Sequence, residues 1–271
     1  MNAKKISSIT NAKIIEELKT FPNQAFIWSI VHRDNPNIWE LPSKQSVMLI
    51  EPYSDEPFVF IAGKLSAQDI EAIIKLCPGN YPRVYCNNLY HPDFLKKGWD
   101  FHLRVELSYD GFGKSIELDE GWRFAKIDNI ELFKQCYWYE KCKELYSSPE
   151  LFLKSKIAYA LCHNDKVISE VYLEHHSSSK HAEFSIVTNP LYRGRGAGTK
   201  IAAYVAAKCK EQGLEPIWSC QVDNRASLHT ALSAGFKIKR SYINMVPEVG
   251  NTLSPVLEKW INENTPINWN Q

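Results

Sequence analysis

A glycine-rich stretch between a strand pattern and a helix pattern constrains this 271-residue chain most. Residues 181–188 alternate apolar and polar side chains, and apolar residues recur at helical spacing after Gly198. A helix start presents unpaired N–H groups and the positive end of its dipole, and glycines let an anion approach them without a Cβ in the way. The stretch therefore predicts a phosphate-binding loop. A plain surface turn of glycine and arginine is the alternative.

Two familiar phosphate loops do not fit the spacing. A P-loop needs G-x-x-x-x-G-K followed by Ser or Thr, which this sequence lacks. A dinucleotide fingerprint needs G-x-G-x-x-G directly after the strand. Here Gly194, Gly196 and Gly198 follow an intervening segment, 189–192, and precede Thr199. Neither nucleotide-binding fold is favoured.

Composition narrows the class of partner. Thirty-two Lys and Arg against 31 Asp and Glu leave a formal charge of +1, so nucleic acid and anionic lipid are not expected partners. Seven cysteines without a C-x-x-C pair indicate neither a disulfide framework nor a zinc site. No apolar run reaches the roughly 18 residues that span a bilayer, and residues 1–5 do not begin a signal peptide, so a cytoplasmic location is expected.

Local patterns predict two parts, each with helices and strands. In the first, helices are expected at 14–21 and 66–76 and near 92–97, and strands at 46–51, 58–62, 83–86 and 101–107. A glycine pair within 109–113 suggests a boundary there. In the second part, strands are expected at 122–127, 157–162, 166–173, 181–188, 216–222 and 238–246, with helices at 130–145, 149–156, 198–212, 226–234 and 253–262. No internal repeat is visible.

The glycine stretch resembles motif A of the GNAT superfamily of acetyl-CoA-dependent N-acyltransferases, [R/Q]-x-x-G-x-[G/A], through Arg193, Gly196 and Gly198. The family's order of elements is matched from Gly121 to Val246. In detail, "TNPLYRGRGAG", "W-S-C-x-x-x-N-x-x-S" and a terminal G-F look most like the branch that includes zwittermicin-resistance-type acetyltransferases. The resemblance implies an α/β (α+β) fold with a mixed, mostly antiparallel central sheet flanked by helices.

The same resemblance implies the domains. An acetyltransferase domain would occupy 114–250, with a C-terminal helix and tail at 251–271. The segment 1–113 has a helix and strand order typical of a domain but no phosphate loop, so we expect an N-terminal α/β domain that walls the acceptor pocket, either as a second layer or as a degenerate GNAT-like copy.

The resemblance also implies the coenzyme site. Amides of the loop would hold the pyrophosphate of coenzyme A, with added charge from two arginines; the loop residues are Arg193, Gly194, Arg195, Gly196, Ala197, Gly198 and Thr199. Backbone groups of Ile186, Val187 and Thr188 would pair with pantetheine. Asn224 and Ser227 would line the pantetheine arm, or else simply cap the next helix. The implied cofactor is acetyl-CoA as co-substrate, with no metal.

Direct acyl transfer to an amine needs a base and a proton for the leaving thiolate. Glu183 lies where many members of the superfamily keep a carboxylate, so it is the candidate base, with an ordinary strand carboxylate as the alternative. Glu170 and Glu174 are reserve bases for which exposed surface roles are expected. The tyrosine acid common in the family is replaced by Ala231, so Tyr242 or solvent would protonate the thiolate.

Other reactive side chains have simpler readings. Cys220 fits a buried thiol better than a nucleophile. His175 and His176 fit solvated loop residues. Lys237, Lys239 and Arg240 fit a solvated strand face better than an adenosine 3′-phosphate site. The sequence thus predicts an acetyltransferase that acts on a small-molecule amine, antibiotic or metabolite. A non-catalytic acyl-CoA-binding module is the alternative, and the oligomeric state is left open.

Overall fold

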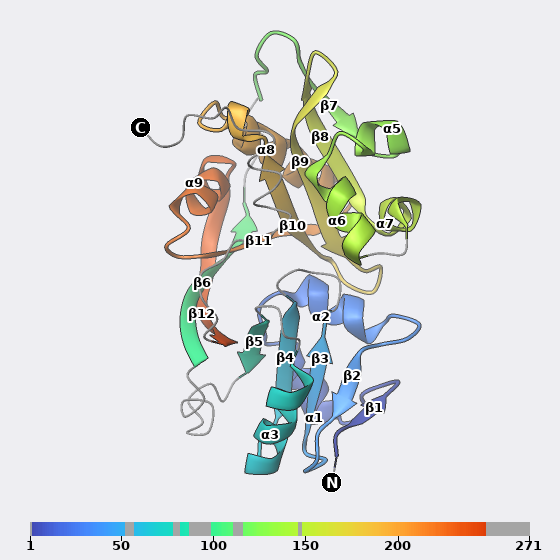
Figure 1. The fold of residues 1–271 in the computed structure, drawn as a ribbon. Coiled ribbons are helices and arrows are strands. Elements are labelled where there is room, and N and C mark those ends of the chain that lie inside the picture. The colour runs from blue at the N-terminus through green and yellow to red at the C-terminus, as the bar shows by residue number, and fades with distance from the viewer. Residues whose placement is uncertain are drawn as a thin grey trace. The chain divides into compact units, whose positions relative to one another are not determined.

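The computed structural model describes residues 2–51, 57–77, 82–86, 99–110, 116–145 and 148–247 (Figure 1). They form two compact units. Of the described residues, the first contains those up to Glu106, His176–Ser179 and Arg240–Pro247; the second contains those of Leu107–His175 and Lys180–Lys239. The sequence-predicted helices at 92–97 and 253–262, and with the latter the whole tail 251–271, lie outside the described residues.

The strands of the first unit are hydrogen-bonded in the order β1-β2-β3-β4-β5-β12-β6. The first four are antiparallel in turn, β5 is parallel to β4, and β12 is antiparallel to β5. Their bounds are β1 Lys4–Ile6, β2 Ile38–Glu40, β3 Ser46–Ile50, β4 Phe58–Gly63, β5 Arg83–Cys86, β6 Trp99–Tyr109 and β12 Phe236–Pro247. Strands β6 and β12 each contribute residues to both units.

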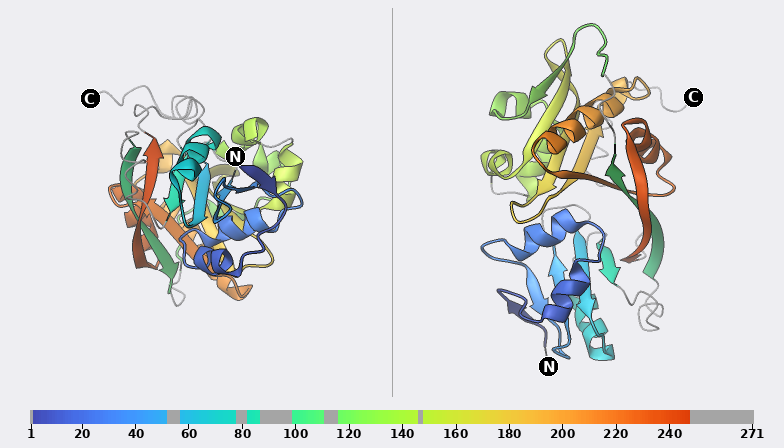
Figure 2. Two further views of the ribbon diagram at one scale, coloured as in Figure 1. Left: turned by 90° about the horizontal axis from the view of Figure 1, so that it is seen from below. Right: turned by 180° about the vertical axis from the view of Figure 1, so that it is seen from behind.

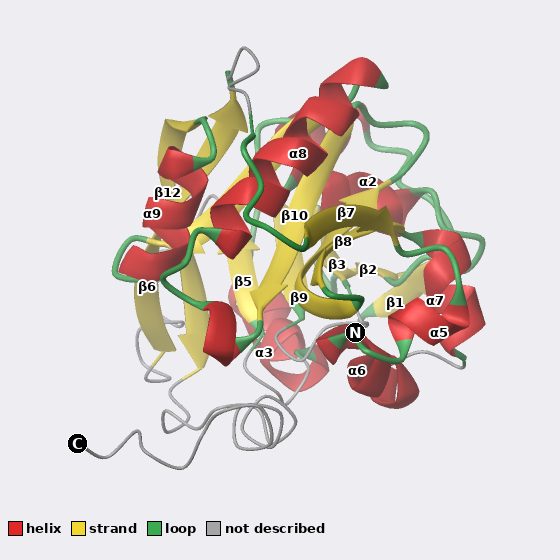
Figure 3. Ribbon diagram, turned by 90° about the horizontal axis from the view of Figure 1, so that it is seen from above, coloured by secondary structure: helices red, strands yellow, loops and turns green. Residues whose placement is uncertain are grey.

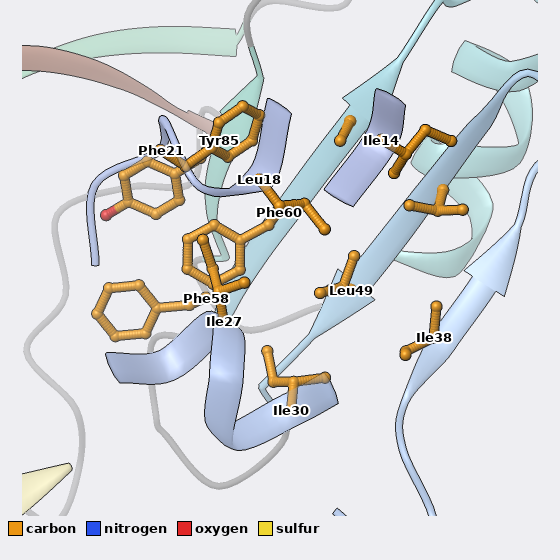
Figure 4. Packing of buried hydrophobic residues seen from close by; sticks show 12 residues of the cluster. Ile14, Leu18, Phe21, Ile27, Ile30, Ile38, Leu49, Phe58, Phe60 and Tyr85 are labelled. Carbon is orange, nitrogen blue, oxygen red and sulfur yellow. The ribbon is translucent and has the colours of Figure 1, made fainter. Parts of the chain in front are cut away.

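Helices cover both faces of this sheet. Helices α1 (Ala12–Leu18) and α2 (Gln24–Val31) pack on one face with Leu49, Phe58 and Phe60, as Figure 4 shows, and α3 (Ala67–Leu76) packs on the other. Alternate residues of β3 and β4 enter the two cores, as the period-2 geometry of a strand requires. The fully buried strands of this unit therefore read as continuous apolar runs in the sequence.

The strands of the second unit are ordered β12-β6-β11-β10-β9-β8-β7. Strands β7 to β10 are antiparallel in turn, and β11 is parallel to β10. The bounds of the strands not yet given are β7 Trp122–Lys126, β8 Ile157–His163, β9 Lys166–His175, β10 His181–Thr188 and β11 Glu215–Gln221. Positive φ at Asn164 and Asp165, 46° and 66°, makes the β8–β9 hairpin turn.

The helices of the second unit also lie on two faces. Helices α5 (Ile130–Phe133), α6 (Tyr137–Leu145) and α7 (Pro149–Ser155) pack on one face of β8 and β9. Helix α8 (Ala197–Glu211) runs along the opposite face, as Figures 2 and 3 show. A 3₁₀ turn, η1 (Pro190–Tyr192), precedes α8, and α9 (Arg225–Ser233) follows β11.

The fold confirms the implied fold class: helices flank a mixed, mostly antiparallel sheet. One local prediction was wrong, and one helix was not predicted. The single helix expected at 130–145 is two helices, because turns at Lys134–Cys136 interrupt it. The helix α2 was not expected, because its run "QAFIWSIV" is apolar on nearly every side and shows no clear period. No helix in the described part of the chain is long and apolar enough to cross a membrane.

Candidate functional site

The loop before α8 has the geometry of an anion cradle. Gly194 and Gly196 adopt φ of 72° and 79°, a region that side chains disfavour. A Cβ on Gly194 would meet no atom within 4 Å, and one on Gly196 would meet only Lys200 Cε at 3.7 Å, so the space in front of this backbone is open. Glycine is therefore required here by backbone conformation and not by crowding.

Helix α8 begins without a side-chain cap. Its N-cap is Gly196, which makes no side-chain hydrogen bond, and the Gly196 carbonyl accepts the first helical bond from Lys200 N at 2.9 Å. The amides of Ala197, Gly198 and Thr199 belong to the first turn, where no carbonyl of the helix can accept from them. The positive end of a 15-residue helix is thus presented with its amides uncapped.

Neighbouring side chains hold the cradle in place. Arg193 Nε donates to the Thr188 carbonyl at 3.3 Å, and desolvation lowers the pKa of this guanidinium. The guanidinium of Arg195 lies 5.3 Å from the Tyr192 ring centroid, and Tyr192 Oη lies 3.0 Å from His163 Nδ1. Gly198 is close-packed, because a Cβ there would lie 3.0 Å from Thr188 Oγ1.

The strand that leads into this loop, β10, pairs with β9 along its whole length but with β11 only at its start. The antiparallel ladder between β10 and β9 runs to the Thr188–Ser169 pair, but the parallel ladder between β10 and β11 stops at Glu183–Ile217. Beyond Glu183, no strand among the described residues pairs with the edge of β10 that faces β11, so this edge is called open. Ile186, Val187 and Thr188 lie on this stretch and are partly exposed. An extended chain could therefore pair with β10 there as an added strand.

Three carboxylates share the face of the sheet opposite α8. The ladder places Glu183 opposite Glu174 and Val187 opposite Glu170, and cross-strand partners point to the same side. All three are buried, with exposures of 4%, 9% and 3% for Glu183, Glu174 and Glu170. The surface roles expected for Glu170 and Glu174 were therefore wrong, because α5, α6 and α7 cover part of this face.

The carboxylate of Glu170 caps the start of α6. Its carboxylate oxygens accept from the amides of Tyr137 and Trp138, each at 3.1 Å. Burial raises the pKa of Glu170 to about 7, although the two amides and the Cys136 thiol favour the charged form. Glu170 is thus committed to a structural contact and is a poor candidate base.

The raised pKa of Glu170 predicts a stability change with pH. A carboxyl whose pKa rises from 4.5 to about 7 on folding favours the native state fully below pH 4.5 and loses this contribution as the pH rises through 7. We expect the contribution to change by roughly 3 kcal/mol over that range. Urea unfolding of the wild type and Glu170→Gln at pH 5, 6, 7 and 8 should show wild-type stability falling relative to the variant. A difference that stays constant with pH would contradict this assignment.

Glu174 is neutralised by Lys156, which lies between α7 and β8. The Lys156 ammonium donates to Glu174 Oε2, and the two side chains are 12% and 9% exposed. No local sequence pattern indicates this lysine, because only the strand register brings residues 18 apart into contact. Glu174 therefore carries its own counter-ion beside Glu183.

Removing this counter-ion should destabilise the fold. Lys156→Met leaves a buried carboxylate uncompensated, and breaking such a pair typically costs about 3–5 kcal/mol. Denaturant unfolding at pH 7 should show a loss in this range, whereas Lys156→Arg should retain most of the stability. The matched surface change Lys208→Met, in a pair with the exposed Glu211, should have little effect. A loss no larger for Lys156→Met than for Lys208→Met would contradict the pairing.

Two candidate coenzyme residues lie at the start of α9. Asn224 is its N-cap, and the side-chain oxygen accepts from Ser227 N at 3.1 Å. The hydroxyl of Ser227 accepts from Trp218 Nε1 at 3.0 Å. Asn224 therefore caps α9, as the alternative predicted for it, whereas the Ser227 side chain bonds Trp218 and does not cap the helix. Their contact with pantetheine stays a prediction.

The remaining candidates lie elsewhere. Tyr242 belongs to the first unit, where it packs against the core and its hydroxyl accepts from Arg104 Nε at 3.2 Å; its role as acid stays a prediction. Cys220 is buried. Ile217 faces the same side of the sheet as its partner Glu183, so Cys220, three residues further along the strand, faces the other side. Arg240 donates to Glu106 and to the Thr20 and Phe21 carbonyls, and Lys237 pairs with Asp110.

His175 and His176 have hydrogen-bonding partners within the hairpin that joins β9 and β10. His175 Nδ1 lies 3.0 Å from the His181 carbonyl, and His176 Nδ1 lies 2.8 Å from Ser178 Oγ. No group of three or more His, Cys, Asp or Glu side chains in the described ranges is arranged to hold a metal ion.

Comparison with known proteins decides the family. The GNAT acetyltransferase family model matches residues 16–245. The chain belongs to this family. An N-acetyltransferase of Bacillus subtilis strain 168, YdfB, itself uncharacterized, is 30% identical over 158 residues. That match covers 55% of this chain, which spans only 58% of the length of its curated relative.

Solved GNAT structures share the fold. A GCN5-related N-acetyltransferase-like protein from Streptococcus suis 89/1591 superposes with a TM-score of 0.67 at 21% identity, over 86% of this chain and 99% of that one. A GCN5-related N-acetyltransferase from Sphaerobacter thermophilus superposes with a TM-score of 0.56 at 12% identity, over 93% and 97% of the two chains. Both similarities extend beyond the residues around the glycine loop. The family supports an acyltransferase activity in general.

Proposed function

We propose that this protein transfers the acetyl group of acetyl-CoA to an amine of a small molecule by direct transfer. One observation carries the proposal. An uncapped helix start behind Gly194 and Gly196 adjoins the strand edge that opens beyond Glu183, and the buried Glu183 carboxylate stands at the last paired position. A phosphate cradle, an open strand edge and a carboxylate therefore occur in one unit.

The residues of this unit fit acetyl-CoA, which would supply the acetyl thioester. Amides from Arg195 to Thr199 would bind its pyrophosphate, and Arg193 and Arg195 would add charge. The backbone of Ile186, Val187 and Thr188 would pair with pantetheine along the open edge of β10. Asn224 and Ser227 would face the same arm from the start of α9.

Glu183 would hold the proton that the attacking amine gives up. Glu183 lies at the last pair of the ladder between β10 and β11, next to the open edge of β10. Proton return to the thiolate would come from solvent. No covalent enzyme intermediate is required.

The acceptor would be a small polar amine, an antibiotic or another metabolite. The resemblance to the zwittermicin-resistance-type branch supports this class. A formal charge of +1 gives no particular attraction to polycations or nucleic acid. With no membrane segment expected from the sequence, the reaction would take place in the cytoplasm.

An amine panel tests the proposal. Purified protein with acetyl-CoA and a set of aminoglycosides, polyamines, amino-sugar and peptide-like amines should release free thiol well above the rate of hydrolysis for at least one acceptor. Binding of acetyl-CoA with no release above hydrolysis for any amine would favour the alternative, a regulatory acyl-CoA-binding module on the same fold.

A further inference from the structure

The two units repeat one topology. In the first, a leading strand β1 is followed by α1 and α2, three antiparallel strands, the crossover helix α3 and the parallel strand β5. In the second, β7 is followed by α5, α6 and α7, three antiparallel strands, α8 and the parallel strand β11. In both, the helices after the leading strand and the crossover helix pack on opposite faces of the sheet.

The last strand of each half of the sequence is hydrogen-bonded beside a strand of the other half. Strand β6 ends the first half of the sequence and β12 ends the second. Yet β12 lies beside β5 in the first unit, and β6 lies beside β11 in the second. The hydrogen-bonded order of each unit is thus the other's with the halves of the sequence interchanged.

We infer that the chain carries the acetyltransferase core twice and that only the second core can bind a coenzyme. The inference rests on the proposed function for the second core. Each of the three features that make the candidate site in the second core has a counterpart in the first, and each counterpart is closed.

The first closed feature is the start of the crossover helix. Where α8 begins at a bare glycine, α3 begins with a capping box. Asp69 Oδ2 accepts from Ser66 N and Ser66 Oγ, both at 2.8 Å, and Asp69 Oδ1 accepts from Ser43 N at 2.8 Å. Asp69 is fully buried, and hydrogen bonds from Ser43 and Ser66 leave its pKa lowered despite burial. The chain's own carboxylate therefore occupies the position that a phosphate would need.

The second closed feature is the strand edge. The ladder between β10 and β11 stops at its third pair, whereas the ladder between β4 and β5 runs through four pairs, from Phe58–Arg83 to Ile61–Cys86. Only Ala62 and Gly63 of β4 lie beyond this ladder, and the Gly63 amide donates to Glu17 Oε2 at 2.9 Å. The edge of β4 that corresponds to the open edge of β10 is therefore short and partly occupied.

The third closed feature is the face that carries Glu183 in the second core. The corresponding face of β4 in the first core carries Phe58 and Phe60, which stack with Tyr85 of β5 at 5.9 and 5.2 Å between ring centroids. These rings pack under α1 and α2 (Figure 4). An aromatic core thus replaces the carboxylates.

The exchange also involves the candidate site. Because β6 lies beside β11, the first half of the sequence supplies a strand to the sheet that carries this site.

Calorimetric titration of the full chain with coenzyme A tests the inference. We expect one equivalent bound per chain, and binding weakened by about 100-fold or more in Gly196→Val, because no second site remains to retain the wild-type affinity. Two equivalents, or one equivalent that survives in Gly196→Val and is lost with Ser66→Val, would overturn it. If the wild type binds no coenzyme A, the proposed function itself is contradicted, and this outcome differs from the two that would overturn the inference.

A second measurement addresses the closed helix start without using coenzyme A. In Asp69→Ala, hydrogen exchange of the Ser43 and Ser66 amides should speed up at least tenfold, because both donate to this carboxylate. The exposed control Glu71→Ala, in the same helix, should leave these two rates unchanged. Unchanged exchange in Asp69→Ala would overturn the assignment of Asp69 as the group that fills this position.

Discussion

Replacing Gly196 by valine is expected to weaken acetyl-CoA binding by about 100-fold or more. The residue has φ of 79°, a conformation that a β-branched side chain does not adopt without strain, so the first turn of α8 must rearrange. The rearrangement would misdirect the amides of Ala197 and Gly198. Two charge-assisted hydrogen bonds at about 1.5 kcal/mol each account for the expected loss. Isothermal titration of wild type and variant measures it.

Gly213 provides the matched control. It follows the other end of α8, has φ of 73°, and a Cβ there would meet nothing within 4 Å. Gly213→Val should therefore carry a similar backbone strain without touching the cradle. If both variants lost affinity equally, the loss would reflect general destabilisation and the loop would not be the coenzyme site.

Replacing Glu183 by glutamine is expected to lower kcat by ~10²–10⁴ with acetyl-CoA affinity nearly unchanged. Glutamine keeps the shape of the side chain but cannot take a proton at neutral pH, and general-base assistance is typically worth this factor. The corresponding loss of transition-state stabilisation is on the order of 3–5 kcal/mol. Steady-state rates with an accepted amine, together with a coenzyme titration, separate the two effects.

The pH profile sharpens this prediction. The deficit of Glu183→Gln should shrink as the pH approaches the pKa of the acceptor, because free amine then forms without help. Glu211→Gln, an exposed carboxylate near the end of α8, is the control and should leave the rate unchanged. Full turnover by Glu183→Gln at neutral pH would move the role to Glu174, Glu170 or solvent.

The second half of the fold could be predicted from local signals. The glycine stretch, the Pro149 helix start and the turn at Asn164 and Asp165 each impose a backbone conformation of their own, so the sequence alone indicates them. The burial of Glu170 and Glu174 could not be predicted in this way. It depends on helices that precede β8 in the chain and fold back over the strand, which periodicity does not report.

The repeated topology could not be predicted from the sequence for a related reason. Equivalent strands carry different residues, "FVFIAG" in β4 and "HAEFSIVT" in β10. One face of β4 packs into an apolar core, whereas the corresponding face of β10 carries the buried Glu183. Only the strand pairing reveals the correspondence. Likewise, Lys156 could be matched to Glu174 only once the register of β8 and β9 was known.

A crystal structure of the full chain with coenzyme A tests the central claim most directly. The account predicts one coenzyme per chain, with its diphosphate within hydrogen-bonding distance of the amides from Arg195 to Thr199 and its pantetheine along Ile186 and Val187. Diphosphate density at the start of α3, or at any position away from the Gly194–Gly196 loop, would contradict it.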